Sequence, residues 1–306
     1  MNVWLPIAIV GHLLNACAFL VDKALLSTAF KRSGTYAALI GGLSCLVFLA
    51  APWTNLPPLQ SWPAIACFGG LFVLAVWAFF EALRRAEATR VVPIIGSLIP
   101  IFTLIDTSLF LSERLSTNGY IGFGLLVVAT GILASGRGKD RLSLATVGIC
   151  VISAFLFAAS SAFGKYGFQT TPFLDVFVWS RVSAGLVALG IALFAPGVRG
   201  ELSKLIFVKS RGAAVEESFA LGLMFFGQAC GAFGFLLVQF AISQGSAAIV
   251  NALQAVQYAA LVLVAWFGGK KIAGLLHERH STSIYLTKGS AIVLVAIGLY
   301  LVTYGV

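Results

Sequence analysis

Long apolar runs recur along the whole chain, and their length is the feature that most constrains its fold. A membrane-spanning helix takes roughly 20 apolar residues, because each residue adds about 1.5 Å across a hydrocarbon core about 30 Å thick. Ten such runs lie at 4–22, 34–52, 63–83, 91–111, 118–135, 144–163, 174–195, 219–240, 246–267 and 286–304. Backbone groups in hydrocarbon must be satisfied within the segment, and the runs are too long and continuous for barrel strands. The sequence therefore predicts an all-α integral membrane protein with ten transmembrane helices.

The composition agrees with this prediction. Hydrophobic residues make up 59% of the chain and charged residues 10%, against about 45–50% and about 25% in soluble domains. This excludes an ordinary soluble enzyme, a disordered chain and a disulfide-stapled secreted domain. The five cysteines lie in apolar runs without a CxxC pair, so we expect neither a zinc site nor a disulfide framework. The first run begins at residue 4 with no Lys or Arg before it, which predicts a first span and not a signal peptide.

Lys and Arg are distributed unevenly between the two sets of loops. They concentrate in the odd-numbered loops, whereas the even-numbered loops and the termini hold only Arg114, with Lys165 at a span edge. The positive-inside rule then places the odd loops in the cytoplasm. We therefore expect a protein of a bacterial-type inner or plasma membrane with both termini on the non-cytoplasmic side. The net charge of +9 is interpreted as this basic membrane face, and no nucleic-acid partner is expected.

The two halves of the chain resemble each other. Residues 113–120 (ERLSTNGY) and 278–285 (ERHSTSIY) share Glu, Arg, Ser, Thr and Tyr at the same places, and a Gly follows four residues later in each. This predicts a first repeat over 1–135 with spans 1–5, a cytoplasmic linker at 136–143, and a second repeat over 144–306 with spans 6–10. Since five is odd, the second copy enters the bilayer upside down. Inverted 5+5 repeats are typical of secondary transporters, whose substrate site lies near the midplane.

Several motifs carry a resemblance to a known family. Residues 82–90 (ALRRAEATR), then Pro93 and Pro100, then residues 111–116 (LSERLS) are similar to EamA-type repeats of the drug/metabolite transporter superfamily. The resemblance implies ten helices, an inverted duplication and alternating access. Members mostly export amino acids, metabolites or drugs, and relatives carry nucleotide sugars or phosphorylated sugars. The chain departs from the pattern where Gln257 matches Pro100, and its charge distribution opposes the cytoplasmic termini of many relatives.

Polar side chains inside the spans predict a substrate cavity. The candidates are His12, Asn15, Trp77, Glu81, Ser97, Gln228, Asn251, Gln254, Gln257 and Tyr258. A polar group in a span is costly and usually faces the bundle interior or a water-filled path. Asn251, Gln254 and Gln257 recur at spacings of three and form a stripe along one helix. Amides both donate and accept hydrogen bonds, which suits a zwitterionic or polyhydroxyl solute. The alternative is that these side chains link helices to each other.

Three charged residues in the spans are candidates for proton or charge sites: Glu81, Asp106 and Arg181. Glu81 is placed to bind a proton or a substrate amine, or else to pair with Arg84 or Arg85 one turn away. Asp106 is a second proton-site candidate, with a helix-linking hydrogen bond as the alternative. Arg181 is expected to pair across helices or to bind an anionic group.

Lys23 and Lys165 occupy matching positions in the two repeats, at opposite faces of the membrane. They are candidate gate or interface residues, because a lysine near a helix end extends its ammonium group to the interface. His12 is isolated in its span, which is more typical of a hydrogen-bonded packing residue than of a ligand.

No enzyme motif is present. The sequence holds no nucleophile elbow, no P-loop, no dinucleotide-binding glycine motif and no metal-spaced histidine cluster, so we expect no enzymatic activity, no cofactor and no metal. The main hypothesis is a secondary transporter that moves a small polar metabolite, amino-acid-like or similar, outward by alternating access. Its partners are then a small-molecule substrate and the lipid bilayer, while the oligomeric state stays open. The alternatives are a flippase for a lipid-linked sugar or head group, and a membrane scaffold without transport.

Overall fold

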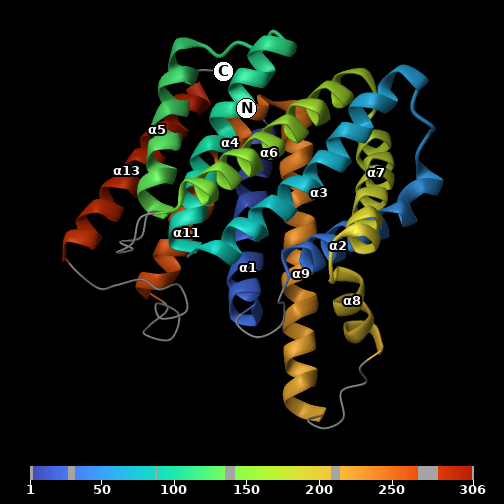
Figure 1. Ribbon diagram of the computed structural model, residues 1–306. Helices are drawn as coiled ribbons and strands as arrows, with labels where there is room; N and C mark the ends of the chain where they lie inside the picture. Colours follow the sequence, from blue (N-terminus) through green and yellow to red (C-terminus); the bar gives the residue numbers. More distant parts are fainter. Residues whose placement is uncertain are drawn as a thin grey trace. The chain divides into compact units, whose positions relative to one another are not determined.

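The structure is a computed structural model that describes residues 3–26, 32–86, 88–134, 142–207, 214–267 and 282–304. Within these ranges every regular element is a helix (Figure 1). The α-helices are α1 (Trp4–Leu26), α2 (Ser33–Ser44), α3 (Trp62–Arg85), α4 (Ala88–Phe110), α5 (Thr117–Ala134), α6 (Leu144–Thr170), α7 (Phe173–Phe194), α8 (Val198–Phe207), α9 (Ala214–Gln244), α10 (Ala247–Ala252), α11 (Gln254–Phe267) and α13 (Thr282–Tyr304). Two 3₁₀ helices, η1 (Cys45–Trp53) and η2 (Leu59–Ser61), flank the connection between α2 and α3.

The helices correspond to the ten predicted runs. Among the described residues, nine helical segments are long and apolar enough to cross a membrane, and Thr117–Leu133 is a shorter apolar helix. The second span consists of α2 continued by η1, and the ninth consists of α10 followed by α11. This confirms the prediction of an all-α integral membrane protein. The α4 helix continues through both Pro93 and Pro100.

Two elements differ from the sequence-based expectation. The α6 helix runs to Thr170 and not to residue 163, so Lys165 lies inside it. The helix stops there because Thr171 precedes Pro172, and a residue before proline is pushed into the extended conformation that Thr171 adopts. The long loop at 196–218 contains α8, which was not predicted because ten residues are too few to cross a bilayer.

The chain forms two compact units. Unit 1 comprises Met1–Thr28, Glu87–Arg141 and Phe219–Val306, and unit 2 comprises Ala29–Ala86 and Leu142–Ser218. Each unit therefore takes helices from both predicted repeats. Residues 136–141 of the predicted linker lie outside the described residues, as does the 278–281 part of the repeated motif. The division into an inverted pair of five-span repeats stays a prediction.

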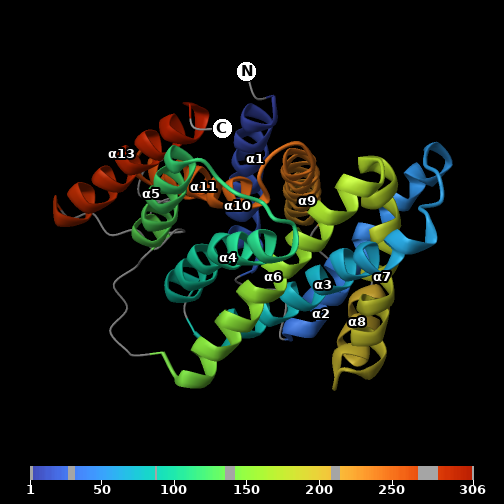
Figure 2. The same cartoon turned by 90° about the horizontal axis from the view of Figure 1, so that it is seen from above.

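In unit 2, α3 is the central helix and packs along α6, α7 and α2 (Figure 2). Two serines of α6 join it to α3: Ser153 Oγ donates to the carbonyl oxygen of Ala75 at 3.0 Å, and Ser160 Oγ donates to that of Phe68 at 2.7 Å. Alanine and β-branched side chains fill the core between α2, α3 and α7: Ala37, Ala38, Val73, Val76, Ala184, Ala188 and Ile191. Close packing of small residues is the way that helices associate in a membrane.

In unit 1, α5 and α13 lie side by side, as both views show (Figures 1 and 2). The α4 helix packs against α5 and α10, and α1 packs against α11. The chain thus brings α10 and α11, the two parts of the ninth span, against helices of the first predicted repeat. This contact sets the positions of the polar side chains described next.

Candidate functional site

A pocket lies within unit 2 and has a volume of about 590 Å³. One face of α3 provides Leu74, Trp77 and Glu81, which recur at spacings of three and four and therefore share a helix face. The start of α2 and the α7–α8 connection close another side. Two of the residues predicted from the sequence, Trp77 and Glu81, are thus brought together in one pocket.

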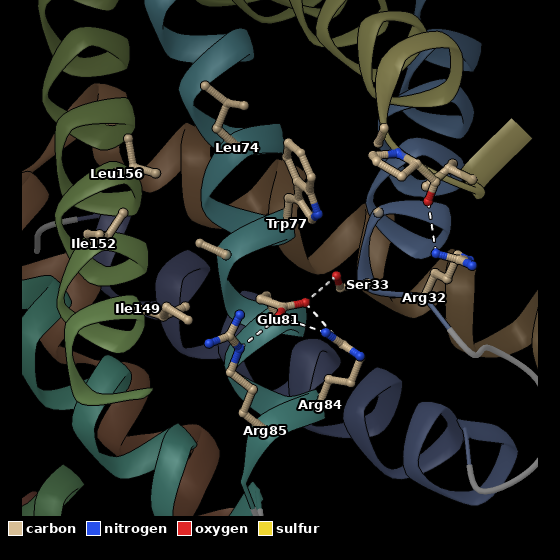
Figure 3. Close-up of a pocket in the computed structure, with 15 residues that line it drawn as sticks. Arg32, Ser33, Leu74, Trp77, Glu81, Arg84, Arg85, Ile149, Ile152 and Leu156 are labelled. Carbon is tan, nitrogen blue, oxygen red and sulfur yellow. Dashed lines mark hydrogen bonds and ion pairs between the residues drawn. The ribbon is translucent and has the colours of Figure 1, made fainter. Parts of the chain in front are cut away.

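One end of the pocket is charged. Glu81 accepts hydrogen bonds from Ser33 Oγ at 2.8 Å, from Arg84 Nε and Nη2 at 3.1 and 2.9 Å, and from Arg85 Nε at 2.7 Å. Both guanidinium groups turn toward the carboxylate (Figure 3). The side chain of Glu81 is 20% exposed, whereas those of Arg84 and Arg85 are 57% and 44% exposed. The pocket therefore presents one carboxylate with two water-facing cations around it, which is the pairing that the sequence offered as an alternative for Glu81.

The opposite side of the pocket is apolar. Ile149, Ile152 and Leu156 of α6 face Trp77 and Leu74 of α3 across the space (Figure 3). Such a wall accepts an apolar or aromatic group through burial, while the charged end fixes the orientation of polar groups. The sequence did not single out the α6 residues or Ser33, because an isoleucine or serine in a membrane segment has no signal that separates a pocket from a helix contact.

A second polar group lies in unit 1, where the helix of the ninth span is interrupted at Leu253 by one tighter turn, in which Val256 N–H donates to the Leu253 carbonyl oxygen at 2.9 Å. The α10 helix ends at Ala252 and α11 begins at Gln254. His12 Nε2 of α1 lies 2.8 Å from the carbonyl oxygen of Val250, in the last turn of α10. The last four carbonyls of a helix lack partners within it, so a side-chain donor satisfies this one. Asn251 Nδ2 donates to Thr103 Oγ1 of α4 at 3.0 Å.

The other amides of the predicted stripe have different surroundings. Gln254 is half-buried and donates through Nε2 to the Tyr258 hydroxyl at 3.0 Å. Tyr258 is buried against α4, where a Cβ at Gly96 would lie only 2.9 Å from its hydroxyl oxygen. Gln257 is buried and approaches the His12 ring. Asn251 and Gln257 thus join helices, and Gln254 is the most accessible member.

Further predicted residues lie elsewhere in unit 1. Asn15 packs through Oδ1 against Gly234 of α9, and Gln228 is half-buried on α9. Ser97 Oγ is buried without a hydrogen-bond partner in the described part of the chain. Asp106 is buried in α4, and its Oδ2 also lacks such a partner there. The structure therefore places Asn251 against α4 and Gln257 against α1, while Asn15 and Gln228 belong to the α1–α9 contact region.

Arg181 lies in the core of unit 2, only 2% exposed. Its guanidinium carbon lies 5.1 Å from the ring centre of Phe177, 5.2 Å from that of Phe68 and 5.9 Å from that of Phe72. Nε and Nη2 donate to Ser180 Oγ at 3.2 and 2.9 Å. Cation–π contacts of this kind stabilise a desolvated arginine.

The two predicted interface lysines are only partly described. Lys165 is half-buried within α6. Lys23 belongs to α1, but its side chain lies outside the described part of the structure. Across the described ranges, no group of three or more His, Cys, Asp or Glu side chains is placed to hold a metal ion.

Comparisons with known proteins agree with the fold and the motifs. Residues 3–135 match the EamA-like transporter family. The chain is 26% identical over 176 residues to the uncharacterized transporter YdfC of Bacillus subtilis (strain 168), a match that covers 55% of this chain and 54% of YdfC. A protein crystal structure with 19% sequence identity covers 98% of this chain and 96% of its own at a TM-score of 0.68, which supports the fold alone. The chain thus carries an EamA-like transporter family domain over residues 3–135, which confirms the resemblance that its sequence motifs indicated.

Proposed function

We propose that the protein is a secondary transporter that moves a small polar metabolite of the amino-acid type, mainly outward, by alternating access between two inverted five-helix halves. The EamA-like domain, the transporter relative and the apolar helices support a membrane transporter. The finer parts of the proposal, which are the substrate class and the direction, rest on the pocket of unit 2.

The composition of this pocket carries the proposal. A zwitterionic amino acid has an ammonium group, a carboxylate and a side chain. A bound substrate exchanges the bonds that Glu81 makes with Arg84 and Arg85: Glu81 then suits the ammonium group, and the two arginines suit the carboxylate through charge-assisted hydrogen bonds. Trp77 with the isoleucines of α6 suits an apolar or aromatic side chain. One pocket therefore offers all three contacts.

The position of the pocket supports outward transport. Its charged end holds Arg32, Arg84 and Arg85, which lie beside the first and third loops. These loops are basic, and the positive-inside rule assigns them to the cytoplasm. A substrate that enters from the cytoplasm meets this end first. The same rule keeps both termini on the non-cytoplasmic side in the proposal.

In unit 1 we assign substrate contact to Gln254 and Tyr258, because Gln254 is half-buried and its hydroxyl partner is a neighbour on the same helix. Such a bond is exchanged for a substrate bond without separating two helices. His12 and Asn251 bond to neighbouring helix segments, so their proposed role in the cavity requires those joints to open during transport.

Reconstituted transport tests the proposal. The purified protein is reconstituted into liposomes that are loaded with an unlabelled amino-acid mixture. Counterflow of radiolabelled leucine, phenylalanine, serine and glutamate into these liposomes is then measured. We expect Trp77→Ala and Glu81→Gln each to lower uptake about tenfold at low substrate, since a lost contact of about 1.4 kcal/mol changes affinity tenfold. Trp53→Ala is the matched control, because Trp53 is 77% exposed and lies outside the pocket.

Two results would overturn the proposal. Wild-type uptake by both Trp77→Ala and Glu81→Gln would remove the assigned site. Folded wild-type protein that exchanges none of the four amino acids would remove the amino-acid substrate class.

A further inference from the structure

Asp106 is a carboxylate buried in a membrane-spanning segment. It lies in α4, within the apolar span Arg90–Phe110, and is only 8% exposed. Its Oδ2 atom is buried and has no hydrogen-bond partner among the described residues. The next residue, Thr107, is fully buried, and its Oγ1 atom likewise has no partner there. Among the described residues, these two oxygens do not participate in the hydrogen bonds that hold the unit together.

The elements packed around Asp106 bring little charge to it. The α4 helix packs against α5 and α10. Tyr120, which is 45% exposed, is the one titratable residue of α5, and α10 carries none. Tyr258 of α11 contacts α4 at Gly96, nearly three turns before Asp106. In the segment after α4, Glu113 and the exposed Arg114 are the charged residues. The Glu113 N–H donates to the Thr107 carbonyl oxygen at 3.1 Å, and both Glu113 carboxylate oxygens are buried without a hydrogen-bond partner among the described residues, so Glu113 is the second acid of this region. Within the described part of the chain, no Lys, Arg or His nitrogen lies within 4.0 Å of the Asp106 carboxylate.

An ionised carboxylate in such surroundings needs a compensating cation, because the membrane interior solvates it poorly. A proton is the smallest cation that compensates it, and the described residues supply no hydrogen-bond partner to Oδ2. We propose that Asp106 is a proton-binding site of the transport cycle, and that the protein exchanges its substrate for protons.

The neighbours of Asp106 connect this site to the broken ninth span. Thr103 lies one turn before Asp106 on α4, so their side chains are about 5–6 Å apart at Cβ. Thr103 Oγ1 accepts the hydrogen bond from Asn251, at the end of α10. Binding or release of the proton therefore changes the charge beside the hydrogen bond that joins α4 to the α10–α11 break.

The step involves only proton transfer. A proton leaves water on one side of the membrane, forms an O–H bond on the Asp106 carboxylate, and leaves that oxygen for water on the other side while substrate moves in the opposite direction. The antiport role rests on the proposed transport function, whereas proton binding by Asp106 does not.

Infrared spectroscopy tests proton binding without any substrate. pH difference spectra of the purified protein in lipid record the C=O stretch of protonated carboxylic acids. We expect a pH-dependent band that is lost in Asp106→Asn and shifted in Asp106→Glu, which keeps the carboxylic acid. Asp175→Asn is the matched control, because Asp175 is 5% exposed but accepts a hydrogen bond from the Asn55 backbone N–H at 3.0 Å. A band unchanged in Asp106→Asn and in Asp106→Glu would overturn the proposal, as would a band that responds to Na⁺ and not to pH.

Transport tests the coupling. In liposomes, a pH gradient is imposed and accumulation of the amino acids named above is compared with counterflow at equal pH. We expect Asp106→Asn to lose the accumulation driven by the pH gradient and to keep counterflow. If Asp106→Asn still accumulates substrate in response to the pH gradient, Asp106 is not the proton site. If the wild-type protein shows counterflow but the pH gradient does not change its uptake, the antiport proposal is overturned and the proposed function stays intact. Absence of wild-type counterflow would count against the proposed function alone, since the infrared result decides proton binding separately.

Discussion

The crossing of α5 and α13 allows a quantitative test of the packing in unit 1. A Cβ at Gly122 would lie 2.8 Å from the carbonyl oxygen of Gly298 and 2.9 Å from Val302 Cγ2. A Cβ at Gly298 would lie 3.0 Å from the Gly122 carbonyl oxygen and 3.0 Å from Leu126 Cγ. Gly122 of α5 meets Val302 of α13, and Leu126, one turn later in α5, meets Gly298, one turn earlier in α13. The two helices are therefore antiparallel. Carbon atoms in contact are normally about 3.5–4.0 Å apart, and the backbone atoms at this crossing cannot rotate away.

The expected cost of Gly122→Ala is the balance of two effects. Alanine is favoured over glycine in a helix by about 0.8–1.0 kcal/mol. Forcing an extra methyl group into a packed contact costs about 1–3 kcal/mol. Gly124→Ala is the matched control, because it lies in the same helix and its Cβ would meet no heavy atom within 4 Å. Since helix propensity cancels between the two variants, we expect Gly122→Ala to be about 1–3 kcal/mol less stable than Gly124→Ala.

Thermal unfolding in detergent measures this difference. A thiol-reactive dye reports unfolding through Cys150 and Cys230, which are buried in the folded protein. Gly124→Ala should melt at or above the wild-type temperature, and Gly122→Ala should melt below Gly124→Ala. Equal melting temperatures for the two variants would refute the close contact between α5 and α13.

Two further predictions concern α8 and the topology. Thr35→Val removes the hydrogen bond that Thr35 Oγ1 donates to Glu201 Oε2 of α8 at 2.7 Å. Hydrogen bonds to charged groups contribute about 1.5–3 kcal/mol, and Glu201 is partly exposed, so we expect this variant to lose about 1–2 kcal/mol of stability in the same melting assay. A wild-type melting temperature would show that this bond does not hold α8. A fluorescent protein that folds only in the cytoplasm, fused after Val306, should stay dark, whereas a fusion after Arg141 should fluoresce; fluorescence from the Val306 fusion would reverse the predicted orientation.

Much of the fold follows from local sequence. A run of about 20 apolar residues specifies a spanning helix whatever surrounds it, so the predicted runs and the observed helices correspond. The end of α6 at Thr170 also had a local signal, because Pro172 lies two residues further on. The polar residues around Lys165 hid that signal, since they suggested that the helix ended earlier.

The break in the ninth span has no local signal. Residues 250–256 (VNALQAV) contain neither Gly nor Pro, and nothing in their composition predicts that α10 ends at Ala252. The carbonyl of Val250 is satisfied by His12, which comes from a helix 238 positions earlier in the chain. A hydrogen bond to a residue so distant in sequence becomes visible only in three dimensions.

The pocket, too, is only partly predictable from the sequence. Trp77 and Glu81 were predicted together because a spacing of four places them on one face of α3. Ser33 and Ile152 complete the pocket from α2 and α6, and neither residue type indicates a site by itself. Sequence periodicity thus predicts which residues share a helix face, whereas it does not predict which second helix that face meets.

The polar residues of unit 1 unite the two interpretations that the sequence left open. A hydrogen bond between helices and a contact with substrate were alternatives for Asn251, and in the structure Asn251 bonds to Thr103. In a bilayer a polar group that leaves one partner must find another at once, because an unsatisfied group costs several kcal/mol. A helix joint that opens during transport must therefore exchange its partner for water or for substrate. Amides and a histidine at a helix break are suited to this exchange, since each offers both a donor and an acceptor. The residues that join helices in unit 1 are for this reason also those that we expect to contact a polar solute when the joint opens.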